Sequence, residues 1–246
     1  MSDPTLPEFM PEQYQEIFCY GAIGTLNAEQ IRELPSIGLA AVRSMAHAAD
    51  EAMGRAQETY NSTHDALTGL YNRRGLMERG EEVLQLNEHT AVIFFDADRF
   101  KRVNDDLGHD VGDGLLKDIA NTLTENVRSQ DIVARLGGDE FVVVLDTSPR
   151  QDSELDLSPK ERVTIVLERI QQSFDQKLAG TNVAGKGVGI SGGFALYDRA
   201  IHHNLADLMQ EADAELYANK AARRQKTIAK RIADVARSWL PKQSRS

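Results

Sequence analysis

The sequence has a single cysteine, no long apolar run, and a deficit of basic charge outside residues 220–246. Cys19 cannot form a disulfide within the chain, which excludes a disulfide-stapled scaffold. No apolar run approaches the ~20 residues that a membrane-spanning helix needs. The acidic N-terminus lacks the basic segment and apolar core of a secretory signal, so a cytoplasmic protein is expected. The 246 residues, 41% of them hydrophobic, suffice for one sizeable core and a small appendage.

The net charge of -10 is spread unevenly along the chain. Residues 220–246 contain nine Lys or Arg and one acid, so the remainder is strongly acidic. An acidic body argues against general nucleic-acid binding, which leaves a basic footprint. The basic tail also carries apolar residues at helical spacing: Ile228, Ile232, Val235 and Trp239. Such a helix could touch an anionic membrane or an acidic partner, although a packed or solvated helix is favoured.

Four segments are expected: an irregular or short-helical segment over 1–36, a connecting helix over 37–63, a catalytic domain over 64–224 and a tail helix over 225–246. Asn27 and Gln30 resemble a capping box for a short helix over Ala28–Leu34. In the connecting helix an apolar seam follows the 3-4 spacing of a coiled coil: Leu39, Val42, Ala46, Ala49, Met53, Ala56 and Tyr60. This helix could be a dimer stalk or could pack on its own domain.

Within 64–224 the pattern predicts an α+β domain with a largely antiparallel sheet. The expected elements are a turn at Asp65–Leu70, a helix capped by Asn72 and running to about Leu86, a strand over Thr90–Phe95, a helix from Gly112 to about Arg128, a hairpin over Ile132–Leu145, a surface loop over 146–159, a helix over 160–178 opened by Pro159, a strand over Val188–Tyr197 and a helix over Leu205–Arg224. Gly192-Gly193 predicts a bulge or a close backbone approach.

The most informative stretch is Arg135–Leu145, where two glycines and two carboxylates lie between apolar runs. Adjacent glycines predict a tight hairpin turn, because glycine accepts a positive φ. Such a turn would hold Asp139 and Glu140 at an exposed tip, where carboxylates can meet a hard metal ion and a phosphate. An ordinary turn with solvated acids would have the same sequence.

Asp96 ends a predicted central strand and, with Asp139, would lie at one edge of the sheet. Two carboxylates and a backbone carbonyl suit Mg²⁺, with nucleotide phosphates as further ligands. In the segment after the strand, Asn104 and Asp113 can together accept from and donate to a guanine edge, although both residues are also common turn formers. Lys220 and Arg224 are spaced i,i+4 and could bind a triphosphate or form a solvated basic face.

Together these segments resemble the GGDEF family, the diguanylate cyclases, over roughly residues 64–224. The resemblance rests on Asp65–Arg74, Asp96–Lys101, Asn104-Asp105, Gly108–Asp113, Arg135–Phe141 and Ala212–Lys220. It implies a nucleotidyl-cyclase or polymerase-palm-like domain that binds GTP with Mg²⁺ or Mn²⁺. Two domains of a homodimer would face each other, and each 3′-hydroxyl would attack the other GTP to give cyclic di-GMP and two pyrophosphates.

The resemblance also assigns residues. The metal ligands would be Asp96, the Ala97 carbonyl, Asp139 and Glu140, with Asp139 also acting on the attacking hydroxyl. Asn104 and Asp113 would read guanine, within a substrate site that includes Gly137, Gly138, Phe100 and His109. Lys101, Lys220 and Arg224 would bind phosphates. Two departures from the family pattern are Arg223, where glycine is common, and Gly192-Gly193; neither touches the proposed ligands.

Arg128 and Asp131 match the family's product-inhibition site, to which Arg74 of a neighbouring domain would contribute. Arginine suits phosphate and stacks on guanine, but an Arg and Asp at i,i+3 are also a common surface pair. Two other functions compete with a cyclase. One is an inactive receptor for GTP or cyclic di-GMP, and the other is a scaffold acting through the heptad stretch over 39–60. Degenerate members usually lose a metal carboxylate or the glycines, all of which this chain keeps, so activity is favoured.

Overall fold

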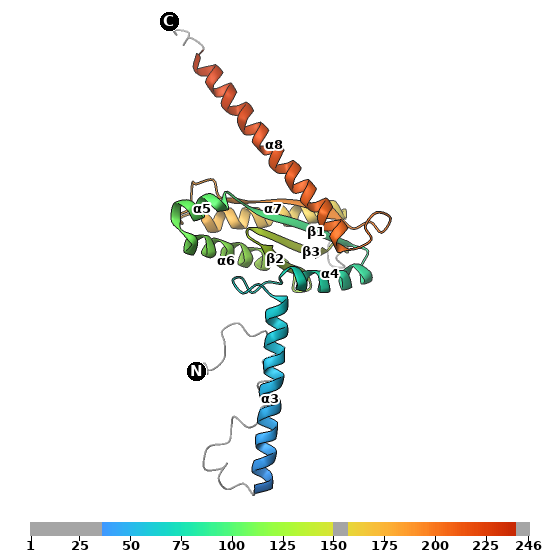
Figure 1. The fold of residues 1–246 in the computed structure, drawn as a ribbon. Coiled ribbons are helices and arrows are strands. Elements are labelled where there is room, and N and C mark those ends of the chain that lie inside the picture. Colours follow the sequence, from blue (N-terminus) through green and yellow to red (C-terminus); the bar gives the residue numbers. More distant parts are fainter. Residues whose placement is uncertain (1–35, 150–156, 240–246) are drawn as a thin grey trace. The chain divides into compact units, whose positions relative to one another are not determined.

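The computed structural model describes residues 36–149 and 157–239, with side chains described for 47–149 and 157–225. The chain divides into two units, 1–62 and 63–246. The first is represented by helix α3, Ser36–Thr63 (Figure 1). This confirms the connecting helix, and among its described seam positions Met53, Ala56 and Tyr60 are half-buried. The short helix expected over Ala28–Leu34 lies outside the described residues.

The second unit is built on a four-stranded antiparallel sheet in the order β2-β3-β1-β4. The strands are β1 (Thr90–Asp98), β2 (Ile132–Gly137), β3 (Glu140–Asp146) and β4 (Gly189–Leu196). The helices are α4 (Arg73–Leu86), α5 (Phe100–Leu107), α6 (His109–Glu125), α7 (Pro159–Leu178) and α8 (Leu205–Trp239). This is the α+β, palm-like architecture that the sequence predicts. No helix within the described residues is long and apolar enough to cross a lipid bilayer.

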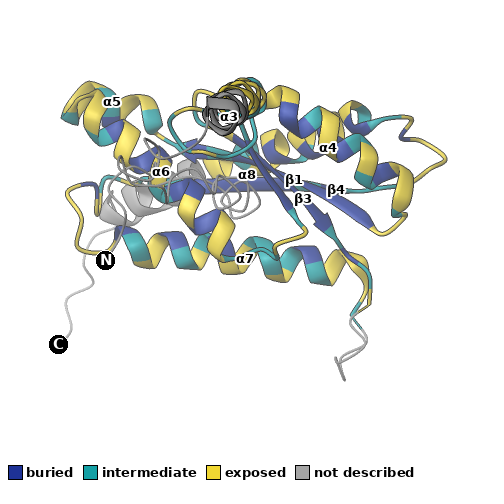
Figure 2. Cartoon of the chain, turned by 90° about the horizontal axis from the view of Figure 1, so that it is seen from below, coloured by how far each residue is buried: buried dark blue, intermediate teal, exposed yellow. Residues whose placement is uncertain are grey.

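Both faces of the sheet are covered, which explains why β1 and β3 are apolar without alternation (Figure 2). On one face Ile93 and Phe95 pack against α6 and α7. On the other, Val92 and Phe94 pack against α4 and α8. Asp96 and Asp98 continue the second set, since side chains alternate along a strand. The end of β1 therefore presents both carboxylates on the face that α8 covers.

Local signals explain most of the element boundaries. Asn72 caps α4 by accepting from the Gly75 N–H at 3.0 Å. Ser158 and Glu161 form a capping box that opens α7, with Pro159 at the first position. The predicted start of a helix at Gly112 was wrong, because α6 begins at His109 and ends at Glu125. A separate helix, α5, precedes it, and Gly108 at a φ of 89° makes the corner between them.

Two further expectations concern the end of the domain. The β1–β4 register runs without interruption through Gly192 and Gly193, so there is no bulge. Gly193 instead permits a close approach, since a Cβ there would overlap the Leu216 backbone nitrogen of α8. Helix α8 runs as one helix to Trp239, so the Lys220–Arg224 segment and the basic residues from Lys226 to Arg237 share a single element. Arg223, where glycine was noted as common, lies inside this helix.

Candidate active site

The end of β1 and the tip of the β2–β3 hairpin meet at one end of the sheet. Asp96 lies opposite Glu140 in the register, and the Ala97 N–H donates to the Asp139 carbonyl at 3.2 Å. The turn needs its glycines, because Gly137 has a φ of 142° and Gly138 a φ of 54°. The structure thus brings together Asp96, Ala97, Asp139 and Glu140, as the sequence analysis expected.

One arginine holds the turn in place. Arg135 Nε and Nη2 donate to the Gly138 carbonyl at 3.1 and 2.8 Å, and Nη1 donates to Asp65 Oδ1 at 2.9 Å. Asp65 also accepts from the Thr68 N–H and hydroxyl. Burial alone would raise the pKa of Asp65, but the hydrogen bonds from Thr68 and Arg135 outweigh it and lower that pKa. The hairpin that carries Asp139 and Glu140 is therefore tied to the turn that follows α3, and sequence reasoning did not find this link.

The carboxylates at this end of the sheet are crowded. Burial raises the pKa of Asp139, and the nearby Asp96 charge raises it further. Burial also raises the pKa of Glu140, with Arg73 opposing the shift. Crowded acids stabilise a bound cation. In this structure the cation beside these acids is the Lys220 ammonium of α8, which contacts Asp96 Oδ1.

The oxygen donors fit Mg²⁺ or Mn²⁺, although they are few. Within residues 47–149 and 157–225, no three or more His, Cys, Asp or Glu side chains gather as a metal site. The expected set contains the carboxylates of Asp96, Asp139 and Glu140 and the Ala97 carbonyl, and Mg²⁺ is commonly held by one or two carboxylates with substrate phosphates completing its shell. The lysine ammonium on Asp96 shows that this end of the sheet accommodates positive charge.

The α5–α6 corner carries the predicted base-reading residues. Asn104 Oδ1 is buried and has no hydrogen-bond partner among the described residues. Gly112 leaves the space for it, because a Cβ there would overlap Asn104 Oδ1 and lie 3.3 Å from the Phe100 ring. Asp113 follows on the exposed side of α6. A buried acceptor without a donor is costly, so the corner is suited to a ligand that brings N–H groups.

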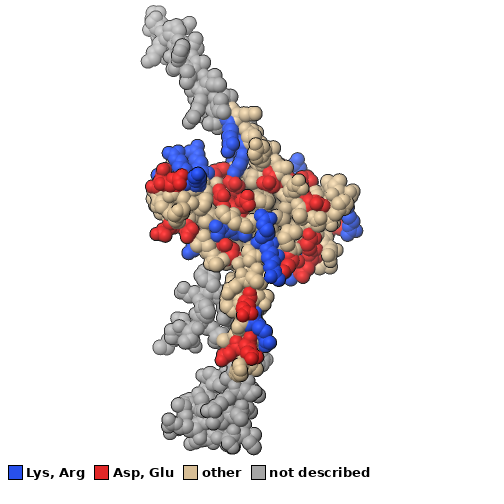
Figure 3. All heavy atoms as spheres, in the orientation of Figure 1, with Lys and Arg blue, Asp and Glu red and all other residues tan. Residues whose placement is uncertain are grey.

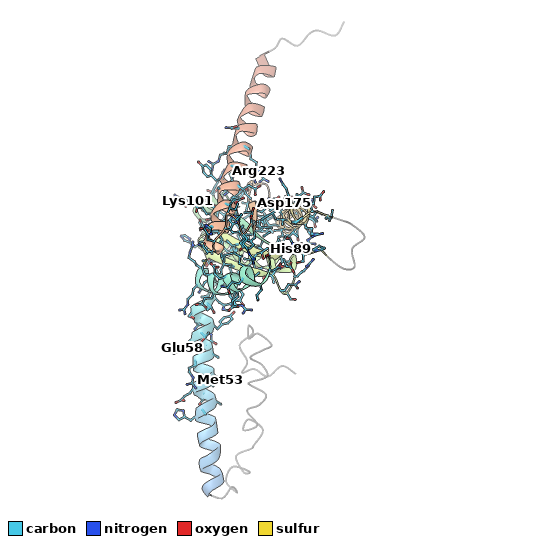
Figure 4. The ribbon with its side chains drawn as sticks, turned by 90° about the vertical axis from the view of Figure 1, so that its right-hand side faces the viewer. Met53, Glu58, His89, Lys101, Asp175 and Arg223 are labelled. Atoms are coloured by element: carbon cyan, nitrogen blue, oxygen red, sulfur yellow. The ribbon has the colours of Figure 1, made fainter. Side chains whose placement is uncertain are left out.

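The predicted phosphate-binding cations lie on two helices. Lys101 of α5 and Arg224 of α8 are exposed, and Lys220 is half-buried. Figure 4 labels Lys101 and Arg223, one on each of these two helices. In Figure 3 acidic atoms lie between the basic atoms over α5 and those at the base of α8. His109 is exposed at the start of α6.

A separate cavity of about 280 Å³ is lined by residues that include Arg128 and Asp131. The Asp131 carboxylate accepts from the backbone N–H groups of Arg128 and Asp146 at 2.8 and 3.1 Å, and burial raises its pKa. Two further arginines of α7, Arg162 and Arg169, line the same cavity. Sequence reasoning missed both, although their spacing of seven residues places them on one helical face.

Arg74 does not line this cavity within its own chain. It lies on α4 and pairs with Glu78 at 2.8 Å. A contribution from a neighbouring domain stays a prediction.

Comparison with known proteins gives consistent matches over the second unit. The family model described as "Diguanylate cyclase, GGDEF domain" matches residues 62–226. The bifunctional diguanylate cyclase/cyclic di-GMP phosphodiesterase MucR of Pseudomonas aeruginosa is 38% identical over 160 residues, which are 63% of this chain and 21% of MucR. Diguanylate cyclase TpbB of the same organism is 34% identical over 180 residues, 72% of this chain and 38% of TpbB. The chain thus spans less than half the length of these relatives.

Solved structures give the same picture. A sensory box/GGDEF family protein from Caulobacter crescentus is 33% identical, with a TM-score of 0.53, over 65% of this chain and 99% of that one. The GGDEF domain of DgcB from Caulobacter crescentus, solved in complex with c-di-GMP, is 26% identical, with a TM-score of 0.53, over 65% of this chain and 91% of that one.

Proposed function

Because this chain belongs to the GGDEF domain family, we propose that it is a diguanylate cyclase, which condenses two GTP molecules into cyclic di-GMP and two pyrophosphates. The observation that carries the proposal is the meeting of Asp96 and Asp139 at one end of the sheet beside the Lys220 ammonium. Carboxylates crowded enough to raise a pKa, next to a lysine, suit a phosphoryl or nucleotidyl transfer site.

Each group has a role in that reaction. Asn104 Oδ1 and the Asp113 carboxylate accept hydrogen bonds from guanine N–H groups. Lys101, Lys220 and Arg224 neutralise the triphosphate and the charge that develops on it. Asp139, with Glu140 beside it, accepts the proton of the attacking 3′-hydroxyl.

The metal ion belongs to the same end of the sheet. Asp96, Asp139, Glu140 and the Ala97 carbonyl would hold Mg²⁺ or Mn²⁺, which would supply Lewis-acid polarisation of the phosphate and lower the pKa of the hydroxyl.

The product requires two copies of the site. Each of the two new phosphodiester bonds of cyclic di-GMP joins the 3′-hydroxyl of one GTP to the α-phosphate of the other, so one bound GTP cannot supply both halves. We propose that α3 brings two copies together through its apolar seam. A chain starting at Ser62 should then lose dimerisation and activity at low concentration, measured by light scattering and product formation. Full activity and a stable dimer of that chain would refute the role given to α3.

Product feedback is proposed at the Arg128 cavity. Two more arginines, Arg162 and Arg169, supply further donors for phosphate and flat surfaces for guanine there. The related DgcB domain is known in complex with c-di-GMP. An Arg128→Ala variant should keep its initial rate and no longer slow as product accumulates. An unchanged inhibition curve would remove this site from the proposal.

The direct test is incubation of the purified protein with GTP and Mg²⁺, with the products separated by chromatography. Cyclic di-GMP and pyrophosphate should form, and an Asp139→Ala variant should form neither. GTP should be used in preference to ATP, because ATP lacks the N–H groups that Asp113 accepts. Absence of product from the wild-type chain across a wide range of protein concentrations would refute the cyclase and leave a receptor for GTP or cyclic di-GMP.

A further inference from the structure

A second carboxylate lies beside the site and has no part in the function proposed above. Asp98 is the last residue of β1 and shares a face of the sheet with Asp96. The Lys220 ammonium contacts Asp96 Oδ1 and lies 3.9 Å from Asp98 Oδ1. Lys220 therefore stands within reach of two carboxylates, and one of them, Asp96, is also an expected metal ligand.

Asp98 is held by a buried serine of the neighbouring strand. Ser191 of β4 is 2% exposed and lies directly opposite Asp96 in the register. Its hydroxyl donates to both oxygens of Asp98, at 2.9 and 2.8 Å, and accepts from Arg223 Nη1 at 3.2 Å. Since a guanidinium can only donate, the serine hydrogen is directed at Asp98. The Asp98 carboxylate thus has a set orientation that does not depend on Lys220.

We propose that Asp98 is the positioning residue of Lys220, and that it keeps the ammonium at the phosphate end of the site when Asp96 is engaged with a divalent cation. This inference rests on the proposed function. A divalent cation on Asp96 repels an ammonium at the same carboxylate. A lysine released in this way would return to water, because its side chain is flexible and strongly hydrated.

Asp98 prevents this release of Lys220 to water. It offers Lys220 a second carboxylate close to the first, so a small torsional change keeps the ammonium paired. The incoming phosphate then meets a cation that is already oriented, and less side-chain freedom is lost on binding. Ser191 contributes by preventing Asp98 from turning away.

The binding of 3′-deoxy-GTP with Mg²⁺ tests this, because the analogue lacks the attacking hydroxyl and is not consumed. Asp98→Asn removes the charge and keeps the shape, while Ser191→Ala removes only the anchor. Each change should raise the Kd, measured by calorimetry, by about three- to tenfold, as expected for a partly buried charge pair. Glu168→Gln on the exposed face of α7 makes the same charge change as Asp98→Asn on the opposite side of the sheet from α8, and should leave the Kd unchanged.

A double-mutant cycle separates positioning from general damage. If Asp98 acts through Lys220, Asp98→Asn should add almost nothing to the Kd of a Lys220→Met chain. An equal loss with and without Lys220, or an unchanged Kd in both the Asp98 and Ser191 variants, refutes the proposal. Thermal unfolding checks that each variant folds.

The two proposals fail in different ways. Binding of the analogue by a wild-type chain that forms no cyclic di-GMP would refute only the cyclase function. No binding by the wild-type chain would refute both.

Discussion

Replacing Arg135 with lysine should loosen the Gly137-Gly138 turn, which carries the proposed catalytic carboxylates, without removing the positive charge. The guanidinium joins two partners at once, the Gly138 carbonyl and the Asp65 carboxylate, and a single ammonium cannot reach both. The Arg135 side chain is 11% exposed and that of Asp65 23%, so water replaces the lost contacts poorly. A hydrogen bond to a charged group contributes about 1.5–3 kcal/mol.

We therefore expect Arg135→Lys to lower the free energy of unfolding by about 2 kcal/mol. For a domain of this size that corresponds to a fall in Tm of about 4–8 °C. The rate of cyclic di-GMP formation should fall by about 10- to 100-fold, because Asp139 follows Gly138 directly and small displacements of catalytic groups slow a reaction strongly. Thermal unfolding and product formation measure the two effects.

The pKa of Asp65 determines how the stability effect of Arg135→Lys depends on pH. The folded-state pKa of Asp65 lies below its ordinary value of 3.8, because the hydrogen bonds from Thr68 and the contact with Arg135 outweigh burial, so these interactions stabilise the fold above that value. This contribution is lost as the pH falls through the lower, folded-state pKa. The gap in stability between wild type and Arg135→Lys should thus be full near neutral pH and should narrow below about pH 4.

A matched control uses an exposed arginine. Arg79 pairs with Glu82 at 2.8 Å, but both side chains are about 60% exposed. Arg79→Lys should change the free energy of unfolding by no more than about 0.5 kcal/mol. The reasoning is refuted if Arg135→Lys behaves like this control in stability and keeps the wild-type rate.

Three other changes test separate parts of the structure. Asp139→Asn should abolish product formation yet slightly raise the Tm at neutral pH. Burial and the Asp96 charge raise the pKa of Asp139, so its ionised form is disfavoured in the fold. A lower Tm at pH 7 would contradict this. Gly193→Ala should destabilise the domain by about 1–3 kcal/mol in chemical denaturation, because its Cβ would overlap the α8 backbone at Leu216, whereas Gly54→Ala, with open space around it, should not destabilise. Asn104→Leu should raise the KM for GTP by at least about tenfold and reduce the preference for GTP over ATP, and an unchanged ratio of kcat/KM values would remove Asn104 from base recognition.

Local sequence patterns predicted much of the domain. The apolar runs of β1 and β3 are long enough to be buried on both faces, and the glycine pair between β2 and β3 requires a turn. The cap residue Asn72 and the proline Pro159 mark where α4 and α7 begin. Each of these signals involves residues close in the chain, so spacing and residue type are enough to find them.

The α5–α6 corner shows where such signals fail. A helix start at Gly112 was expected because Gly108 and its neighbours look like a turn. The chain instead forms two helices around Gly108, and burial of Val103 and Leu115 against the sheet stabilises them. Tertiary packing overrides weak local preference in short helices.

By itself the sequence determined the fold class, the glycine turn with its carboxylates, and the order of the motifs that place this chain in its family. Only the tertiary structure decided which distant groups meet. Arg135 finds Asp65 across 70 residues, and Ser191 finds Asp98 across 93. The physical reason is that strand pairing sets these contacts: the bridge between Tyr71 and Ala134 brings the Asp65 turn to Arg135, and the pairing of β1 with β4 places Ser191 beside Asp98. Neither pairing is encoded in the spacing of nearby residues. The sequence showed the carboxylates, but only the fold showed that Ser191 orients Asp98 and that Lys220 contacts Asp96.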